Sequence, residues 1–326
     1  NTGIVPVPDE RLDKLAELVH TRNKVTTQME FVDIAGLVKG ASQGEGLGNQ
    51  FLGHIRQVDA IVHVVRCFAD DNVIHVDGSV DPLRDREVIN TELIIADLDT
   101  VDKRLAKTRN QAKSGDKKLV AQVTFLELLH GVLDSGRPAR GVEAADPAQK
   151  EVLRELCLLT DKPVLYVANV HENDLATGNP LVAKLQAAAK EEGASVVMIA
   201  GNIEQELSLL SPEEQKEFLA DLGLAEPGLN RLIRAGYQLL DLITFFTVGE
   251  KETKAWTIKR GTRSPGAAGK IHSDFERGFI RAEVIAYADY IACGTEAKAK
   301  EKGLMRSEGK EYVVQDGDCI LFRFNV

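Results

Sequence analysis

The chain has 326 residues, with 50 acidic side chains against 40 basic ones and a formal net charge of −10. Its 44% hydrophobic and 28% charged residues are typical of a globular protein, which excludes a disordered chain, a collagen and a coiled-coil rod. Apolar runs fall short of the ~18–20 residues that cross a bilayer, so we expect no membrane partner. The four cysteines are scattered without a CxxC pair, which predicts a reducing, cytoplasmic setting.

Three continuous apolar runs predict strands of a parallel sheet, and an alternating segment before them predicts a further strand. Residues 29–35 alternate and lead into a glycine-rich stretch, as a strand followed by a loop does. The runs at 60–68, 162–168 and 194–200 are continuously apolar, which is typical of strands buried on both faces of an α/β sheet. A helical pattern covers 180–192, and Ser211-Pro-Glu-Glu214 has the form of a capping box.

Residues 88–135 predict an antiparallel helical hairpin that interrupts the α/β alternation. Apolar residues recur at 4-3-4 spacing at Ile94, Leu98, Val101 and Leu105. Residues 113–118 form a turn signal before a second apolar run. Seven basic residues gather at 101–120, so we expect Lys113, Lys117 and Lys118 at the tip to bind RNA or the ribosome. A solvated helix face is the alternative.

After Leu242 the pattern predicts a β-rich domain of short strands at 244–248, 254–259, 281–286, 312–314 and 319–324, with a helical turn at 264–269. Trp256 and Phe275, near Lys254, form a basic and aromatic combination that can stack on RNA. A core position is the alternative for the single tryptophan.

A glycine-rich motif begins at the end of the predicted strand at 29–35. Asp33-Ile34-Ala35-Gly36 has the DxxG form of the Walker B and switch element of P-loop NTPases, in which the aspartate holds Mg²⁺ and the glycine follows the γ-phosphate. Five glycines occupy residues 36–48 and permit the backbone to approach a ligand closely. The strand before the motif favours a nucleotide site over a merely flexible loop.

A second motif, Asn169-Val170-His171-Glu172, follows the strand at 162–168. GTP-binding domains have NKxD at this place, and its aspartate accepts hydrogen bonds from two guanine donors. Val170 and Glu172 replace the lysine and the aspartate, which favours adenine, because a displaced acceptor leaves the guanine donors unpaired. A third motif, Ala200-Gly201-Asn202, is expected to offer a backbone amide to the base.

These motifs closely resemble the YchF (Obg-like ATPase) family over nearly all of the chain, together with VVRCF, EPGLNRLIRAGY and the final VQDGDCILFRFNV. The resemblance implies an α/β fold: a P-loop G domain with an inserted helical hairpin and a C-terminal TGS domain of the β-grasp type. It further implies ATP with Mg²⁺ as the ligand, with GTP bound more weakly, and slow hydrolysis. The implied partner is the ribosome, through its large subunit or ribosomal RNA, with a regulatory role in translation or stress; no DNA is expected.

The resemblance also implies domain boundaries and roles for single residues. We expect a G domain at 1–92 and 159–242, a helical hairpin at 93–158 and a TGS-like domain at 243–326. Asp33 would hold the metal, and Gly36 and Leu37 are candidate catalytic residues. His63 is a third candidate, because of its place next to the switch strand rather than through the resemblance. Leu37 stands where Ras-like GTPases keep a glutamine, so hydrolysis should be slow. For His63 the alternative is a histidine satisfied in the core. The expected nucleotide contacts are Asn169, Val170, Glu172, Ala200, Gly201 and Asn202.

One element of the family pattern does not occur in these residues. No GxxxxGK[ST] sequence is present, so the chain lacks the usual phosphate-binding loop. We therefore expect the parent protein to be an ATPase and this chain to bind nucleotide weakly or not at all. The alternatives are an adaptor that binds RNA or the ribosome without catalysis, and an Obg-type GTPase.

Overall fold

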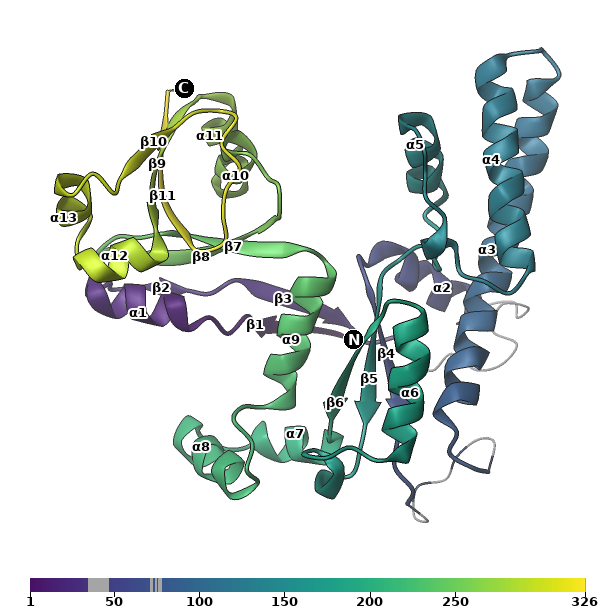
Figure 1. The fold of residues 1–326 in the computed structure, drawn as a ribbon, viewed down its shortest axis with the longest axis horizontal. Helices are drawn as coiled ribbons and strands as arrows, with labels where there is room; N and C mark the ends of the chain where they lie inside the picture. The colour runs from purple at the N-terminus through teal and green to yellow at the C-terminus, as the bar shows by residue number, and fades with distance from the viewer. Residues whose placement is uncertain (35–46, 71–72, 74, 76–77, 326) are drawn as a thin grey trace. The chain divides into compact units, whose positions relative to one another are not determined.

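The computed structural model describes residues 1–34, 47–70, 73, 75 and 78–325 (Figure 1). It divides into two compact units. The first consists of Asn1 with Val32–Ala235, and the second of Thr2–Phe31 with Gly236–Val326. Among the described residues, no helix is long and apolar enough to cross a membrane.

The first unit is built on a three-stranded parallel sheet. Its strands are β4 (Ile61–Arg66), β5 (Val164–Asn169) and β6 (Ser195–Ile199), in the order β4-β5-β6. The central strand β5 is buried on both faces, and Tyr166 packs with Leu185 and Leu207 in one core cluster. The parallel sheet and the α/β class predicted from the continuous apolar runs are therefore confirmed.

Helices follow or separate these strands. The α-helices are α2 (Leu47–Gln57), α3 (Pro82–Ala112), α4 (Lys117–Asp134), α5 (Pro147–Leu156), α6 (Pro180–Glu191), α7 (Gly201–Leu207) and α8 (Pro212–Asp221). Two 3₁₀ turns are η1 (Ala139–Gly141) and η2 (Glu172–Asp174). The predicted capping box is present at the start of α8: Ser211 Oγ accepts from the Glu214 N–H, and the Glu214 carboxylate accepts from the Ser211 N–H.

The predicted helical hairpin is formed by α3 and α4, which lie side by side (Figure 1). Val101 and Leu105 of α3 pack with Leu126 and Leu129 of α4, and all four side chains are buried. The turn ends at Asp116, whose carboxylate accepts from the Lys118 N–H at 2.8 Å and caps α4. The heptad-like spacing therefore reflects a real seam between two helices.

One buried carboxylate fixes the base of the hairpin. Asp97 of α3 is fully buried and accepts hydrogen bonds from the Leu159 N–H at 2.8 Å, the Thr160 N–H at 2.7 Å and the Thr160 hydroxyl at 2.7 Å. Since Leu159 and Thr160 precede β5, this contact joins the long helix to the chain that enters the sheet.

The second unit contains a six-stranded mixed sheet of order β10-β9-β11-β7-β8-β2. Its strands are β2 (Lys24–Val25), β7 (Leu242–Thr247), β8 (Thr253–Lys259), β9 (Phe279–Ala286), β10 (Arg306–Glu308) and β11 (Asp318–Phe324). Phe245, Val284 and Ile320 belong to one core cluster of this unit, whereas Phe246, Ile285 and Cys319, next to them along the strands, belong to another. The helices are α1 (Glu10–Leu18), α10 (Ser264–Ile271), α11 (Ser273–Arg277), α12 (Tyr287–Cys293) and α13 (Glu296–Glu301).

Some N-terminal residues group differently from the expected boundaries. Residues Thr2–Phe31 belong to the second unit, whereas the sequence predicts 1–92 as part of the G domain. The reason is local pairing: β2 pairs with β8, and Leu12 and Leu15 of α1 pack in the cluster of Phe246. Two further strands, β1 (Thr2–Pro6) and β3 (Gln28–Val32), pair with each other, and α9 (Gly228–Leu239) contains the division between the units.

Candidate functional site

The carboxyl ends of the three parallel strands form one edge of the first unit's sheet. Arg66 of β4 is in register with Asn169 of β5, and Asn169 is in register with Ile199 of β6. Ligands of open α/β sheets bind outside the carboxyl ends of the strands. The residues directly after these strand ends are therefore the candidate site, and they include both motifs expected to hold a base.

Asn169 joins the two motifs. Its Oδ1 atom accepts a hydrogen bond from the Gly201 N–H at 3.1 Å, so the end of β5 is tied to the first residue of α7. A methyl group added at Gly201 would lie 3.6 Å from the same oxygen, which is ordinary contact distance. The structure thus brings together two segments that are 32 residues apart in sequence.

Val170 and Glu172 differ sharply in exposure. Val170 is 2% exposed in the sheet's core, and its N–H donates to the Ile199 carbonyl at 2.9 Å. Its side chain therefore stabilises the sheet, and only its backbone faces the edge. Glu172 begins η2 and is exposed, so its carboxylate is available at the site.

The third motif also divides between core and surface. Ala200 is fully buried, whereas Gly201 and Asn202 are exposed at the start of α7. The Ala200 side chain accordingly packs in the core cluster, and a ligand at this edge would meet Gly201 and Asn202.

Asn179 is an organising residue that the sequence reasoning missed. Its Nδ2 donates to the Cys67 carbonyl at 2.7 Å and to Asp174 Oδ2 at 2.8 Å. Its Oδ1 accepts from two N–H groups of α6, at Leu181 and Val182. One side chain therefore holds together the chain after β4, the turn η2 and the start of α6. The dipeptide Asn179-Pro180 was the available signal, since asparagine before a proline marks a helix start.

Arg66 fixes the loop that follows β4. Its guanidinium donates to the carbonyl oxygens of Phe68 at 3.1 Å, Asp70 at 3.2 Å and Val73 at 2.9 Å, and it lies over the Phe68 ring. A single arginine in a strand gives no sequence signal for such a role, because its partners are backbone atoms.

His63 lies in the middle of β4, three residues before its end. Its ring is 5.5 Å from the ring of Tyr166, the residue in register on β5. Burial, aided by the positive charges of Arg86 and Arg140, lowers the pKa of His63 to about 4. The ring is therefore neutral at pH 7, in surroundings that suit a packed histidine; its catalytic assignment stays a prediction.

The predicted metal ligand Asp33 is exposed directly after β3, and its N–H donates to the Asn1 carbonyl at 2.7 Å. Gly36 and Leu37 lie outside the described residues. Within the described ranges, no cluster of three or more His, Cys, Asp or Glu side chains is suited to a metal ion. A lone carboxylate still fits Mg²⁺, which binds proteins through one or two carboxylates together with substrate phosphates and water.

Six of the seven basic residues at 101–120 fall into two groups. Lys103, Arg104 and Arg109 form ion pairs with acidic neighbours, at 2.6–2.7 Å. The tip residues Lys113, Lys117 and Lys118 are exposed, and no ion pair engages them in the part of the chain that the structure describes. Lys107 is likewise exposed and without an ion pair among the described residues, so three of the four unpaired basic residues at 101–120 are at the tip.

Comparison with known proteins agrees with this architecture. A family profile described as "50S ribosome-binding GTPase" matches residues 14–96, and a profile for the C-terminal domain of YchF-type GTPases, described as a protein of unknown function, matches residues 242–325. A Bacillus subtilis relative, named ribosome-binding ATPase YchF, is 56% identical over 328 residues, covering 100% of this chain and 89% of the relative. The chain belongs to the YchF family.

Other YchF proteins support the assignment. The Escherichia coli O157:H7 relative, which has the same name, is 52% identical and covers 100% of this chain and 89% of its own length. A structure described as the Schizosaccharomyces pombe YchF GTPase aligns with a TM-score of 0.88 and 37% identity, covering 99% of this chain and 87% of that one. The family recognised from the motifs is therefore confirmed over the full chain.

Proposed function

We propose that this YchF protein, once its nucleotide site is completed by a Walker A loop, binds and hydrolyses ATP in preference to GTP, and that it does so while associated with the ribosome. The names of the Bacillus subtilis and Escherichia coli relatives, ribosome-binding ATPases, support ATP hydrolysis and association with the ribosome. The Schizosaccharomyces pombe structure is described as a GTPase, so the choice of base has to be argued from the residues of this chain.

The bond between Asn169 and Gly201 is the observation that carries the proposal. It holds the two base-binding segments together at the sheet edge, and the exposed Glu172 carboxylate follows Asn169 by three residues. A guanine site needs an acceptor placed for the N1–H and the 2-amino group, both of which adenine lacks. The longer glutamate side chain displaces that acceptor, and buried donors left unpaired cost more than a lost contact.

Different residues of this chain would contact the base, the metal ion and the γ-phosphate. Asn169, Gly201 and Asn202 would frame the base, while Asp33 would hold Mg²⁺. When bound, Mg²⁺ neutralises the phosphate charge that develops during transfer. Gly36 would follow the γ-phosphate, and the hydrocarbon side chain of Leu37 has no group to orient water, so hydrolysis should be slow.

A paired titration tests nucleotide binding. ATP and GTP, each with Mg²⁺, are titrated into this chain and into the same chain extended at Asn1 by a YchF-type strand, Walker A loop and switch I threonine. We expect micromolar ATP binding only in the extended form and at best millimolar binding in this one, because the chain contains no GxxxxGK[ST] sequence. If neither form binds, the adaptor function without catalysis replaces the ATPase proposal.

Base selectivity is tested separately in the extended form by Glu172→Asp. Val170 is left unchanged because a lysine there would be buried in the core. The shorter carboxylate should shift the ratio of ATP to GTP affinity toward GTP by about tenfold. Glu206→Asp, at an exposed position of α7, is the matched control and should leave the ratio unchanged. If the ratio of ATP to GTP affinity is unchanged in Glu172→Asp, the length of the Glu172 side chain does not set the preference for adenine.

We also propose that the hairpin tip contacts the large ribosomal subunit or its RNA, in the cytoplasm. Reversing Lys113, Lys117 and Lys118 to glutamate should weaken ribosome co-sedimentation and lower its salt dependence by a slope of roughly 2–3. The control reverses three exposed lysines elsewhere in the first unit, Lys150, Lys190 and Lys216. Equal losses in both variants would return the tip to an ordinary solvated helix face.

A further inference from the structure

The central strand β11 of the second unit has one partly open edge. All of β11, from Asp318 to Phe324, is in antiparallel register with β9. On its other side only Cys319 is in register with β7, at Phe246, because β7 ends one residue later at Thr247. Within the described residues, no strand therefore pairs with this side of residues 320–324, which we call the open edge of β11.

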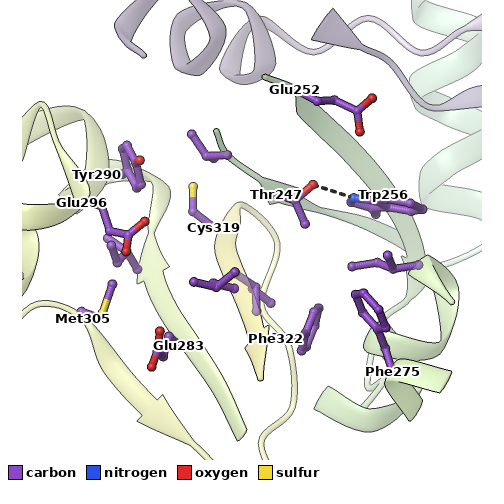
Figure 2. Close-up of a pocket in the computed structure, with 15 residues that line it drawn as sticks. Thr247, Glu252, Trp256, Phe275, Glu283, Tyr290, Glu296, Met305, Cys319 and Phe322 are labelled. Carbon is purple, nitrogen blue, oxygen red and sulfur yellow. Dashed lines mark hydrogen bonds between the residues drawn. The ribbon is translucent and has the colours of Figure 1, made fainter. Parts of the chain in front are cut away.

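A pocket of about 310 Å³ lies beside this edge (Figure 2). Four consecutive residues of β11, 319–322, contribute to its lining. Successive side chains of a strand point to opposite faces of the sheet, so a pocket lined by four in a row runs along the strand's edge rather than over one face. Thr247 and Trp256 stand across from β11, and Trp256 Nε1 donates to Thr247 Oγ1 at 3.0 Å.

The lining combines apolar surface with negative charge. Trp256, Phe275 and Met305 supply part of the apolar wall (Figure 2). The charged side chains that line the pocket are all glutamates: Glu252, Glu283 and Glu296.

The three glutamates differ in their ion pairs. Glu283 is neutralised by ion pairs with Arg281 and Arg323, at 3.1 and 2.9 Å. Glu252 and Glu296 are exposed, and neither takes part in an ion pair in the described part of the chain. A ligand of the pocket is therefore favoured if it carries positive charge.

We propose that this pocket binds an extended peptide segment, with alternating apolar and basic side chains, as an added strand on the open edge of β11. Strand addition uses unpaired backbone groups for affinity and the side-chain pockets beside them for selectivity. Natural proteins protect strand edges from pairing unless the edge has a use. The apolar side chains would lie against Trp256 and Phe275, and the basic ones would reach Glu252 and Glu296.

Nucleic acid is the less favourable occupant. The sequence pairs Trp256 and Phe275 with nearby lysines as an RNA-stacking surface, but the glutamates that line the same pocket repel phosphates. Lys254 is already engaged, with its Nζ 3.9 Å from the centre of the Trp256 ring.

The single tryptophan of the chain lines the pocket and reports binding directly. The probe is a blocked peptide of about eight residues with alternating valine and lysine, titrated into the full chain to about 1 mM while Trp256 emission is followed. We expect saturable binding in the micromolar range. The same peptide with alternate backbone amides N-methylated should bind at least about tenfold more weakly, because it cannot form the ladder. A valine–glutamate peptide and an oligouridine should not bind.

Two further measurements locate the site. Reversing Glu252 and Glu296 to lysine should weaken binding at least about tenfold, whereas reversing Glu301 and Glu311, exposed elsewhere in the unit, should not. Hydrogen exchange of the unmodified chain should slow at residues 320–324 when peptide is bound. No emission change at about 1 mM, equal binding of the N-methylated peptide, or binding of oligouridine alone would each overturn the proposal.

Discussion

Replacing Asp97 with alanine should destabilise the first unit by about 3–5 kcal/mol. The carboxylate is fully buried and accepts three hydrogen bonds, two from the backbone N–H groups of Leu159 and Thr160 and one from the Thr160 hydroxyl. Leu159 and Thr160 are themselves 0% and 1% exposed, so water cannot readily replace the lost acceptor.

The size of this destabilisation follows from the three hydrogen-bond donors that lose the Asp97 carboxylate as their acceptor. Each buried donor without a partner costs about 1–3 kcal/mol, and the two backbone N–H groups cannot rotate toward another acceptor. The Thr160 hydroxyl adds less, because its hydrogen can turn about the Cβ–Oγ1 bond and its oxygen still accepts from the Ala139 N–H at 3.0 Å. Removing a buried charge returns part of its desolvation cost, which keeps the total below the sum of the three donors.

Urea unfolding followed by far-ultraviolet circular dichroism measures the effect. The long helices α3 and α4 belong to the first unit, so the loss of helical signal reports on the unit that contains Asp97. Asp99→Ala is the matched control: this exposed neighbour pairs with Lys103 at 2.6 Å, and surface ion pairs contribute about 0–1 kcal/mol.

The pH dependence has a definite sign. Burial raises the pKa of the Asp97 carboxyl above 3.8, against the lowering effect of its hydrogen bonds from Thr160 and Leu159. A carboxyl whose pKa is higher in the folded than in the unfolded state contributes stability that is fully present below its unfolded-state pKa. This stability is lost as the pH rises through the folded-state pKa. The deficit of Asp97→Ala should therefore be larger in acid than at pH 7. If Asp97→Ala lowers the free energy of unfolding no more than Asp99→Ala does, the cost assigned to the buried hydrogen bonds of Asp97 is wrong.

Three further predictions concern other described residues. Because burial lowers the pKa of His63 to about 4, stability should fall by about 2 kcal/mol between about pH 6.5 and pH 5, and His63→Phe should remove most of this loss in urea titrations. Asn179→Ala should lower the free energy of unfolding by about 1–2 kcal/mol in the same assay, since the cap of α6 and the hydrogen bonds to the Cys67 carbonyl and to Asp174 are lost. Ellman's reagent should label Cys157 alone in the folded chain, because the other cysteines are buried and burial raises the pKa of Cys67 to about 11 and of Cys319 to about 12; rapid labelling after Cys157→Ser would contradict this.

Much of the fold could be predicted because its parallel strands are continuously apolar in sequence, although only β5 is buried along nearly its whole length. The apolar runs at 60–68, 162–168 and 194–200 contain or overlap β4, β5 and β6, with ends that differ by one or two residues. The hairpin was predictable because its apolar seam repeats over several turns. Short elements were not: β1 is largely exposed and has no periodic pattern, and α12 and α13 are too short to show one.

Other features depend on contacts that no local pattern encodes. Residues 312–314 read as a strand, but the structure has only an isolated bridge between Arg263 and Val313 there. In the candidate site, Asn169 and Glu172 could be predicted from a motif with fixed spacing. The bonds of Arg66 and Asn179 run to backbone atoms of other segments, and these partners are brought near only by the folded chain.

The attachment of α3 at Asp97 makes the hairpin a lever. From Asp97 to Ala112 the helix rises 1.5 Å per residue, which places the tip about 22 Å from this attachment. A rotation of roughly 10° about Asp97 would carry the tip lysines through about 4 Å, more than the length of a hydrogen bond. A small angular change at the base is thus large enough, at the far end, to make or lose a hydrogen-bond contact of the tip lysines.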